Sequence, residues 1–79
     1  MTIEIKAKVG NRIRELRKIK GLSQETLAGL AEIDRTYMTS VENGKRNISI
    51  VNIERIASAL GVSVKEFFNE EKFDKKIEK

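Results

Sequence analysis

The chain has 79 residues, enough for one small domain, and carries 16 basic and 12 acidic side chains for a net charge of +4. It contains no cysteine and no histidine, which excludes disulfides, thiol chemistry and the common zinc sites. Without a disulfide or a zinc site to stabilise it, a domain this small depends on well-packed helices and on oligomerisation. No apolar stretch has the length of a membrane span or signal peptide, so we expect a cytoplasmic protein.

The positive charge is concentrated in the first part of the chain. Residues 1–47 carry 10 basic and 6 acidic side chains, whereas residues 48–79 carry 6 of each. A partner with phosphate groups would therefore meet the N-terminal part. Charge alone is equally compatible with a solvated basic face that binds nothing.

Helix starts are marked by a pattern that occurs four times: an apolar residue, then Ser or Asp, and a second apolar residue five positions after the first. The four cases are Leu22-Ser23 with Leu27, Ile33-Asp34 with Met38, Ile48-Ser49 with Ile53, and Val62-Ser63 with Phe67. This spacing is typical of an N-cap flanked by a hydrophobic staple, because the polar oxygen accepts a hydrogen bond from the first turn while the apolar pair packs together.

Helix ends are marked by Gly21, Gly44 and Gly61, at positions where positive φ is expected. The punctuation predicts an all-α, single-domain fold over 1–79 with five helices, at about 5–20, 24–31, 35–43, 50–60 and 64–71. The helices at 5–20 and 50–60 carry the apolar stripe of packed amphipathic helices. The charged tail lacks such a stripe, so we expect residues 72–79 to fray.

The second and third predicted helices are separated by three residues only, which forces a steep crossing and predicts a helix-turn-helix. Ala28 and Ala31 supply small contacts at the crossing. The outward face of the third helix then presents polar groups, and its N-terminal residues are those that meet base edges in this motif. Arg35 can bond to guanine, Thr36 can touch a thymine methyl, and Ser40 is a further candidate. Ordinary solvated side chains are the alternative for all three.

Phosphate contacts are predicted on both sides of this face. Ser23 and Gln24 open the second helix, where the helix dipole favours an anion. Tyr37 can give its hydroxyl to a phosphate, or it can be a partly buried core residue. An ordinary helix start is the alternative for Gln24.

The loop Asn43-Gly44-Lys45-Arg46-Asn47 is rich in hydrogen-bond donors, which suits a contact with the DNA backbone. Arg46 can reach a base or a phosphate, while Asn43, Lys45 and Asn47 are candidate phosphate ligands. A solvated turn is the alternative. Arg17 and Glu42 are predicted to form a partly buried, bidentate ion pair with a structural role if the first helix packs across the third.

Residues 10–62 resemble the phage-repressor-type, lambda-repressor-like helix-turn-helix family across RIRELRKIKGLSQETLAGLAEIDRTYMTSVENGKRNISIVNIERIASALGVS. Within that family, DRTYMTSVENGKRNISI and the pair Phe67-Phe68 resemble the controller proteins of restriction–modification systems. The resemblance implies homodimers on palindromic operators, pairing of two dimers on DNA, contact with RNA polymerase, and control of the controller gene and of the linked endonuclease gene. The sequence has no histidine, no cysteine, no metal-ligand cluster and no phosphate-binding loop, so no catalytic group stands out and we expect neither an enzyme nor a cofactor.

Residue by residue, the resemblance implies base contacts by Arg35, Thr36 and Arg46, and an ion pair between Arg17 and Glu42. Backbone contacts are implied for Tyr37, Asn47 and Gln24. One departure is Glu32, which stands where the turn often has glycine; if φ is positive there, a non-glycine residue costs about 1 kcal/mol.

A dimer is also expected because one small domain reads too few base pairs for specificity in a genome. Val64, Phe68 and Val51 lie off the predicted core stripes, and together with the staple residue Phe67 we expect them to form a two-fold apolar patch at the dimer interface. A core that takes up all four is the alternative. The competing functions are another repressor-type regulator, such as a phage repressor or the DNA-binding half of an antitoxin, and a helical protein-interaction module.

Overall fold

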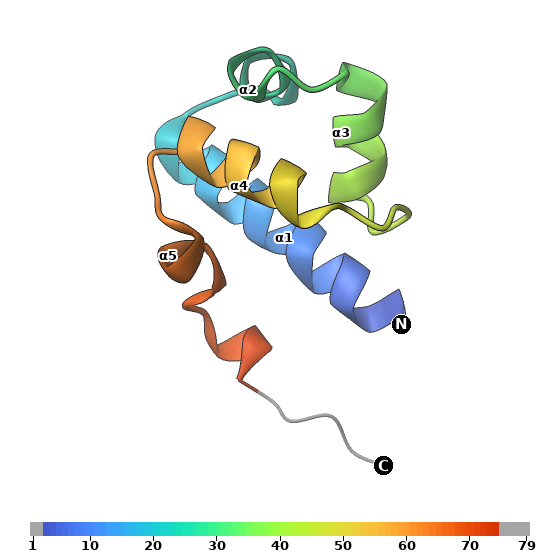
Figure 1. The fold of residues 1–79 in the computed structure, drawn as a ribbon, viewed down its shortest axis with the longest axis vertical. Helices are drawn as coiled ribbons and strands as arrows, with labels where there is room; N and C mark the ends of the chain where they lie inside the picture. The colour runs from blue at the N-terminus through green and yellow to red at the C-terminus, as the bar shows by residue number, and fades with distance from the viewer. Residues whose placement is uncertain (1–2, 75–79) are drawn as a thin grey trace.

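The computed structural model describes residues 3–74 and contains five α-helices and one 3-10 helix in that range, with no strand (Figure 1). The elements are α1 (Ile3–Lys20), α2 (Gln24–Ala31), α3 (Arg35–Glu42), α4 (Ile50–Ala59), α5 (Val64–Phe68) and η1 (Glu71–Phe73). The predicted all-α fold with five helices is confirmed. None of the described helices has the length and apolar character needed to cross a membrane.

Each of the four predicted N-caps forms. Ser23, Asp34, Ser49 and Ser63 accept a hydrogen bond from the backbone amide three residues further on, which satisfies one of the unpaired donors of the first turn. Ser63 also forms a capping box, because the carboxylate of Glu66 accepts from its backbone amide at 3.0 Å. Local sequence therefore sets where these helices begin.

The ends of α1 to α4 share one arrangement of two backbone hydrogen bonds, in which the chain turns back onto the last helical carbonyls. Glycine occupies the left-handed position after α1, α3 and α4, but Glu32 occupies it after α2, with φ 57° and ψ 46°. The positive φ that was the condition for strain at Glu32 is therefore present. The turn of the helix-turn-helix thus keeps its usual shape at the cost of a strained glutamate.

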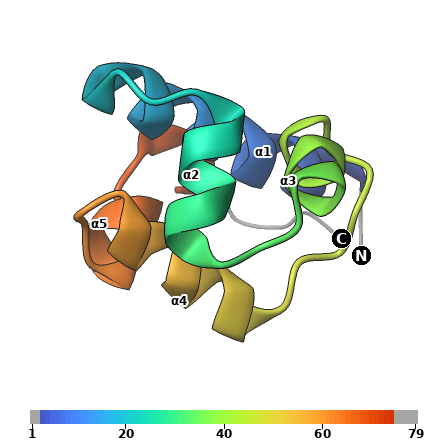
Figure 2. The same cartoon turned by 90° about the horizontal axis from the view of Figure 1, so that it is seen from above.

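The helices pack so that α1 lies along α3, α2 contacts both α3 and α4, and α5 covers the end of α4 (Figures 1 and 2). Helix α2 is seen end-on in Figure 1, whereas α3 is seen end-on in Figure 2, so the two cross steeply as the short connection requires. Helix α1 approaches α3 most closely at Gly10, where a Cβ atom would meet the carbonyl oxygen of Val41 at 2.5 Å.

The core lies between these helices and is built from apolar side chains of α1 to α5. Its largest fully buried members are Phe67, Ile13, Leu27, Met38, Ile56, Leu60 and Val41. The second apolar residue of each predicted staple is buried, and the first is packed, partly buried, against the core. The staples thus join each helix start to the common core.

The C-terminal segment corrects two expectations. Helix α5 ends at Phe68, earlier than predicted, and residues 72–74 are ordered. The ring of Phe73 packs edge-on against Phe68 with centroids 5.0 Å apart, and Lys72 Nζ lies 2.8 Å from Glu15 on α1. The hydrogen bond from Lys72 lowers the pKa of Glu15. The rest of the expected frayed tail, 75–79, lies outside the described residues.

Candidate nucleic-acid interface

The first turn of α3 presents two polar side chains to solvent. Arg35 and Thr36 are exposed, and Ser40, one turn further on, is half-buried. The nearby carboxylate of Asp34 is occupied as the helix cap, where it accepts from the backbone amide of Tyr37 at 3.1 Å. The face therefore offers a guanidinium and hydroxyl groups at the end of the helix where base contacts are made in this motif.

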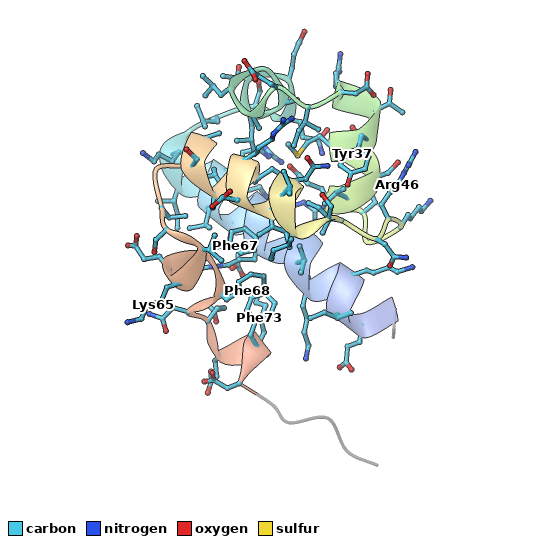
Figure 3. The ribbon with its side chains drawn as sticks, in the orientation of Figure 1. Tyr37, Arg46, Lys65, Phe67, Phe68 and Phe73 are labelled. Carbon is cyan, nitrogen blue, oxygen red and sulfur yellow. The ribbon has the colours of Figure 1, made fainter. Side chains whose placement is uncertain are left out.

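The loop that follows the C-terminal end of α3 carries further hydrogen-bond donors, and its Arg46 lies beside Tyr37 of α3 (Figure 3). Asn43, Lys45, Arg46 and Asn47 are all exposed. The loop turns at Gly44, where a Cβ atom would lie 3.1 Å from the Cα atom of Ala7 on α1, so the close approach as well as the positive φ favours glycine. The turn at Gly44 therefore brings the start of the cationic loop close to the backbone of α1.

Tyr37 connects this loop to α4. Its ring is half-buried against the core, and the guanidinium carbon of Arg46 lies 5.3 Å from the ring centroid. Its hydroxyl oxygen accepts a hydrogen bond of 3.3 Å from the side-chain amide of Asn52. The two alternatives for Tyr37 are thus compatible, because the ring is partly in the core while the hydroxyl lies at the polar edge.

Behind the interface, Arg17 and Glu42 form a bidentate pair. Arg17 Nε donates to Glu42 Oε2 at 2.9 Å, and Arg17 Nη2 donates to Oε1 at 3.0 Å. The Glu42 side chain has no exposed surface, while that of Arg17 is 14% exposed. A third Arg17 hydrogen bond, to the carbonyl oxygen of Leu22, ties the end of α1 to the start of the helix-turn-helix. The pair thus fixes α1 against α3.

Gln24 is turned toward this ion pair. Its amide nitrogen donates to Glu42 Oε1 at 3.1 Å, and its amide oxygen accepts from the hydroxyl of Thr39 at 3.0 Å. The hydroxyl of Ser23, the N-cap of α2, accepts from the backbone amide of Thr26 and donates to the Thr26 hydroxyl. Both side chains predicted to face a phosphate therefore already have protein partners, and Gln24 keeps one amide hydrogen for any outside acceptor.

Sequence reasoning missed three side chains that organise the site. Arg14 donates to the backbone oxygen of Glu42 at 3.0 Å and lies 3.5 Å from Asn43 Oδ1, so it holds the end of α3. Thr39 and Asn52 are the partners of Gln24 and Tyr37. For Arg14 a signal existed, because it precedes Arg17 by one helical turn; none marked the other two.

The residues of the predicted apolar patch differ in how far they are buried. Val51 is 56% exposed, and Val64 and Phe68 are half-buried. Phe67 is 0% exposed, which corrects its assignment to the surface patch. The staple residue Phe67 points into the core and packs against the half-buried Phe68, with the two rings edge-to-face and their centroids 4.9 Å apart (Figure 3).

Comparisons of sequence and of structure identify known proteins that are similar to this chain. The helix-turn-helix family matches residues 13–67. Control protein C.MunI of a Mycoplasma species is 48% identical over 85% of this chain and 92% of its own length, and control protein C.BamHI of Bacillus amyloliquefaciens is 41% identical over 87% and 86%. The crystal structure of the restriction-modification controller protein C.AhdI from Aeromonas hydrophila shares 54% identity over 80% of this chain and 96% of that chain, with a TM-score of 0.77. The chain therefore belongs to the helix-turn-helix family and, within it, to the controller proteins of restriction–modification systems.

Proposed function

We propose that the chain is a sequence-specific DNA-binding regulator of a restriction–modification system, acting by binding rather than by catalysis. The observation that carries the proposal is the exposed first turn of α3, with Arg35 and Thr36, together with the exposed cationic loop, containing Lys45 and Arg46, that follows the other end of the same helix. A helix end with free hydrogen-bonding side chains suits the major groove, and a flanking cationic loop suits the phosphates.

Base contacts are assigned to Arg35, Thr36 and Ser40, which share one face of α3, and to Arg46 in the loop. Bidentate hydrogen bonding by an arginine to guanine discriminates against other bases by about 1–3 kcal/mol. Arg35 is the first candidate for this role, because it is exposed at the first position of α3.

Backbone contacts are assigned to side chains that border this face. Asn43, Lys45 and Asn47 are exposed in the loop, and the hydroxyl of Tyr37 lies at its edge. At the start of α2, the contact is assigned to the remaining amide hydrogen of Gln24 and to the exposed Ser23. Such contacts set the register of the protein on the duplex and carry no sequence information themselves.

We further propose that the protein acts as a cytoplasmic homodimer on a palindromic operator, with Val51, Val64 and Phe68 in the two-fold contact. These side chains form an apolar, partly exposed set on α4 and α5. A dimer doubles the length of DNA that is read and places the two recognition helices about 34 Å apart. Pairing of two dimers on DNA and contact with RNA polymerase belong to the same proposal, as does control of its own promoter and of the endonuclease gene.

The test is an anisotropy titration of labelled duplex taken from immediately upstream of the gene, with a scrambled duplex as control, at about 50 and 200 mM salt. Arg35→Ala is expected to weaken operator binding by about 1–3 kcal/mol and to relax the preference at one base pair. Arg55→Ala is the matched control, because Arg55 is an exposed arginine on α4 to which no DNA contact is assigned.

Tight, salt-sensitive binding to the upstream duplex alone, weakened in Arg35→Ala and kept in Arg55→Ala, supports the proposal. Equal binding to both duplexes contradicts control of its own promoter. Absence of binding to either duplex at low salt refutes the DNA-binding function and favours a protein-interaction module.

A further inference from the structure

A connected set of side chains joins α4 to the cationic loop through Tyr37. The guanidinium of the exposed Arg46 lies over the Tyr37 ring, 5.3 Å from its centroid (Figure 3). A guanidinium within about 6 Å of an aromatic face is attracted by the negative potential of the ring. The ring therefore holds a side chain that would otherwise sample many rotamers in solvent.

The ring is itself held from two sides. Its body packs against the core, and its hydroxyl accepts from Asn52 Nδ2 at 3.3 Å. The backbone of Asn52 is fixed, because the residue lies in the first turn of α4 and its backbone amide donates to the cap Ser49 at 3.1 Å. The position of the Tyr37 ring is thus tied to the start of α4.

We propose that Asn52 is a positioning residue for DNA recognition: through the Tyr37 hydroxyl it fixes the ring that holds the Arg46 guanidinium before DNA arrives. The proposal rests on the proposed function, in which Arg46 contacts DNA. A long side chain loses rotamer freedom when it is immobilised in an interface, and a side chain that is held beforehand loses less. Asn52 then contributes to affinity and to base preference without touching a base.

The first test uses the free protein and needs no DNA. The Arg46 side-chain protons are shifted in the NMR spectrum by the ring current of Tyr37, the one tyrosine of a chain without tryptophan. In Asn52→Ala and Tyr37→Phe, which lose the hydrogen bond but keep the ring, these shifts are expected to move toward those of Tyr37→Leu. Ser58→Ala, at an exposed position of α4, is the matched control and keeps the wild-type shifts. Wild-type Arg46 shifts in Asn52→Ala would refute the positioning role.

The second test is a double-mutant cycle on the operator with Asn52→Ala and Arg46→Ala. Because an exposed cation–π contact is weak, Asn52→Ala is expected to lower operator affinity by about two- to fivefold. It should add no further loss in the Arg46→Ala background, and it should weaken the same base preferences that Arg46→Ala weakens. Equal unfolding midpoints of Asn52→Ala and wild type show that the fold is intact.

The outcomes separate this inference from the proposed function. An equal loss from Asn52→Ala in both backgrounds shows that Asn52 contacts DNA directly and refutes its action through Arg46. Wild-type affinity and base preference in Arg46→Ala refute a recognition role for Arg46, and with it the consequence proposed for Asn52. If wild-type protein binds no operator, the proposed function fails, whereas the Arg46 shifts still decide whether Asn52 positions that side chain.

Discussion

Removal of Arg17 tests how much its ion pair with Glu42 contributes to the stability of the fold. The Glu42 carboxylate has no exposed surface and receives two charge-assisted hydrogen bonds from Arg17. Leaving a buried charge without its partner costs about 3–5 kcal/mol. Gln24 still donates to the carboxylate and Arg14 Nε lies 3.6 Å from it, so part of the charge stays compensated. Arg17→Ala is therefore expected to lower the unfolding free energy by about 3 kcal/mol, at the lower end of this range.

Two comparison variants sharpen this expectation. Arg14→Ala removes a longer contact from a side chain that is 35% exposed, so its ion pair with Glu42 contributes about 1 kcal/mol or less. Glu42→Gln in the Arg17→Ala background replaces the buried carboxylate by a neutral amide, and it is expected to recover part of the loss because no unpaired charge is then buried.

Urea unfolding followed by far-ultraviolet circular dichroism measures these differences. Protein concentration must be held fixed, because unfolding of a dimer depends on it. With a slope of about 1 kcal/mol per molar urea, a loss near 3 kcal/mol moves the midpoint by about 3 M. A loss below about 1 kcal/mol in Arg17→Ala, with no larger loss in the Arg14→Ala, Arg17→Ala double variant, would show that the carboxylate is solvated and would refute the reasoning.

Three further predictions concern the turn, the C-terminal segment and the dimer. Glu32→Gly is expected to raise the unfolding free energy by about 0.5–1 kcal/mol, because glycine adopts positive φ without strain; an unchanged urea midpoint would argue against strain at this turn. Lys72→Gln is expected to raise the pKa of Glu15, measured by NMR titration of its carboxyl carbon, because the Lys72 hydrogen bond lowers that pKa from 4.5. The pKa of Glu15 is lower in the folded than in the unfolded state, so its ion pair with Lys72 stabilises the fold fully above pH 4.5. The difference in unfolding free energy between wild type and Lys72→Gln therefore disappears as the pH falls through the folded-state pKa of Glu15. A difference that persists in acid would contradict its origin in the ionised carboxylate. Val51→Lys is expected to shift sedimentation equilibrium toward monomer by placing a charge in the apolar patch, while Ile19→Lys, on an exposed residue of α1, leaves it unchanged; equal association of both variants would exclude Val51 from the contact.

The starts of α2 to α5, the ends of α1 to α4 and the crossing of α2 and α3 were predictable because each depends on neighbours within a few residues. A cap such as Ser49 reaches an amide three positions away, and the short connection around Glu32 leaves α2 and α3 few alternatives to a steep crossing. The exposed ends of the site, Arg35 and Arg46, were predictable for the same reason, since they follow a cap and a glycine turn.

What could not be predicted depends on contacts between distant parts of the chain. Gln24 carries no local sign that its amide bridges Glu42 and Thr39, which lie 18 and 15 positions away. Phe73 lies in a charged tail without periodicity, yet it is held by Phe68 and by the neighbouring ion pair of Lys72 with α1. Such contacts arise only when the helices have docked.

The sequence by itself determined where α2 to α5 begin, the helix-turn-helix and the face of α3 that carries Arg35, because hydrogen bonding and apolar periodicity within one or two turns decide them. The tertiary structure alone decided which polar side chains face inward and how Arg46 is held. Asn52 reaches Tyr37 across 15 positions, and only the docked helices bring its short amide within 3.3 Å of that hydroxyl.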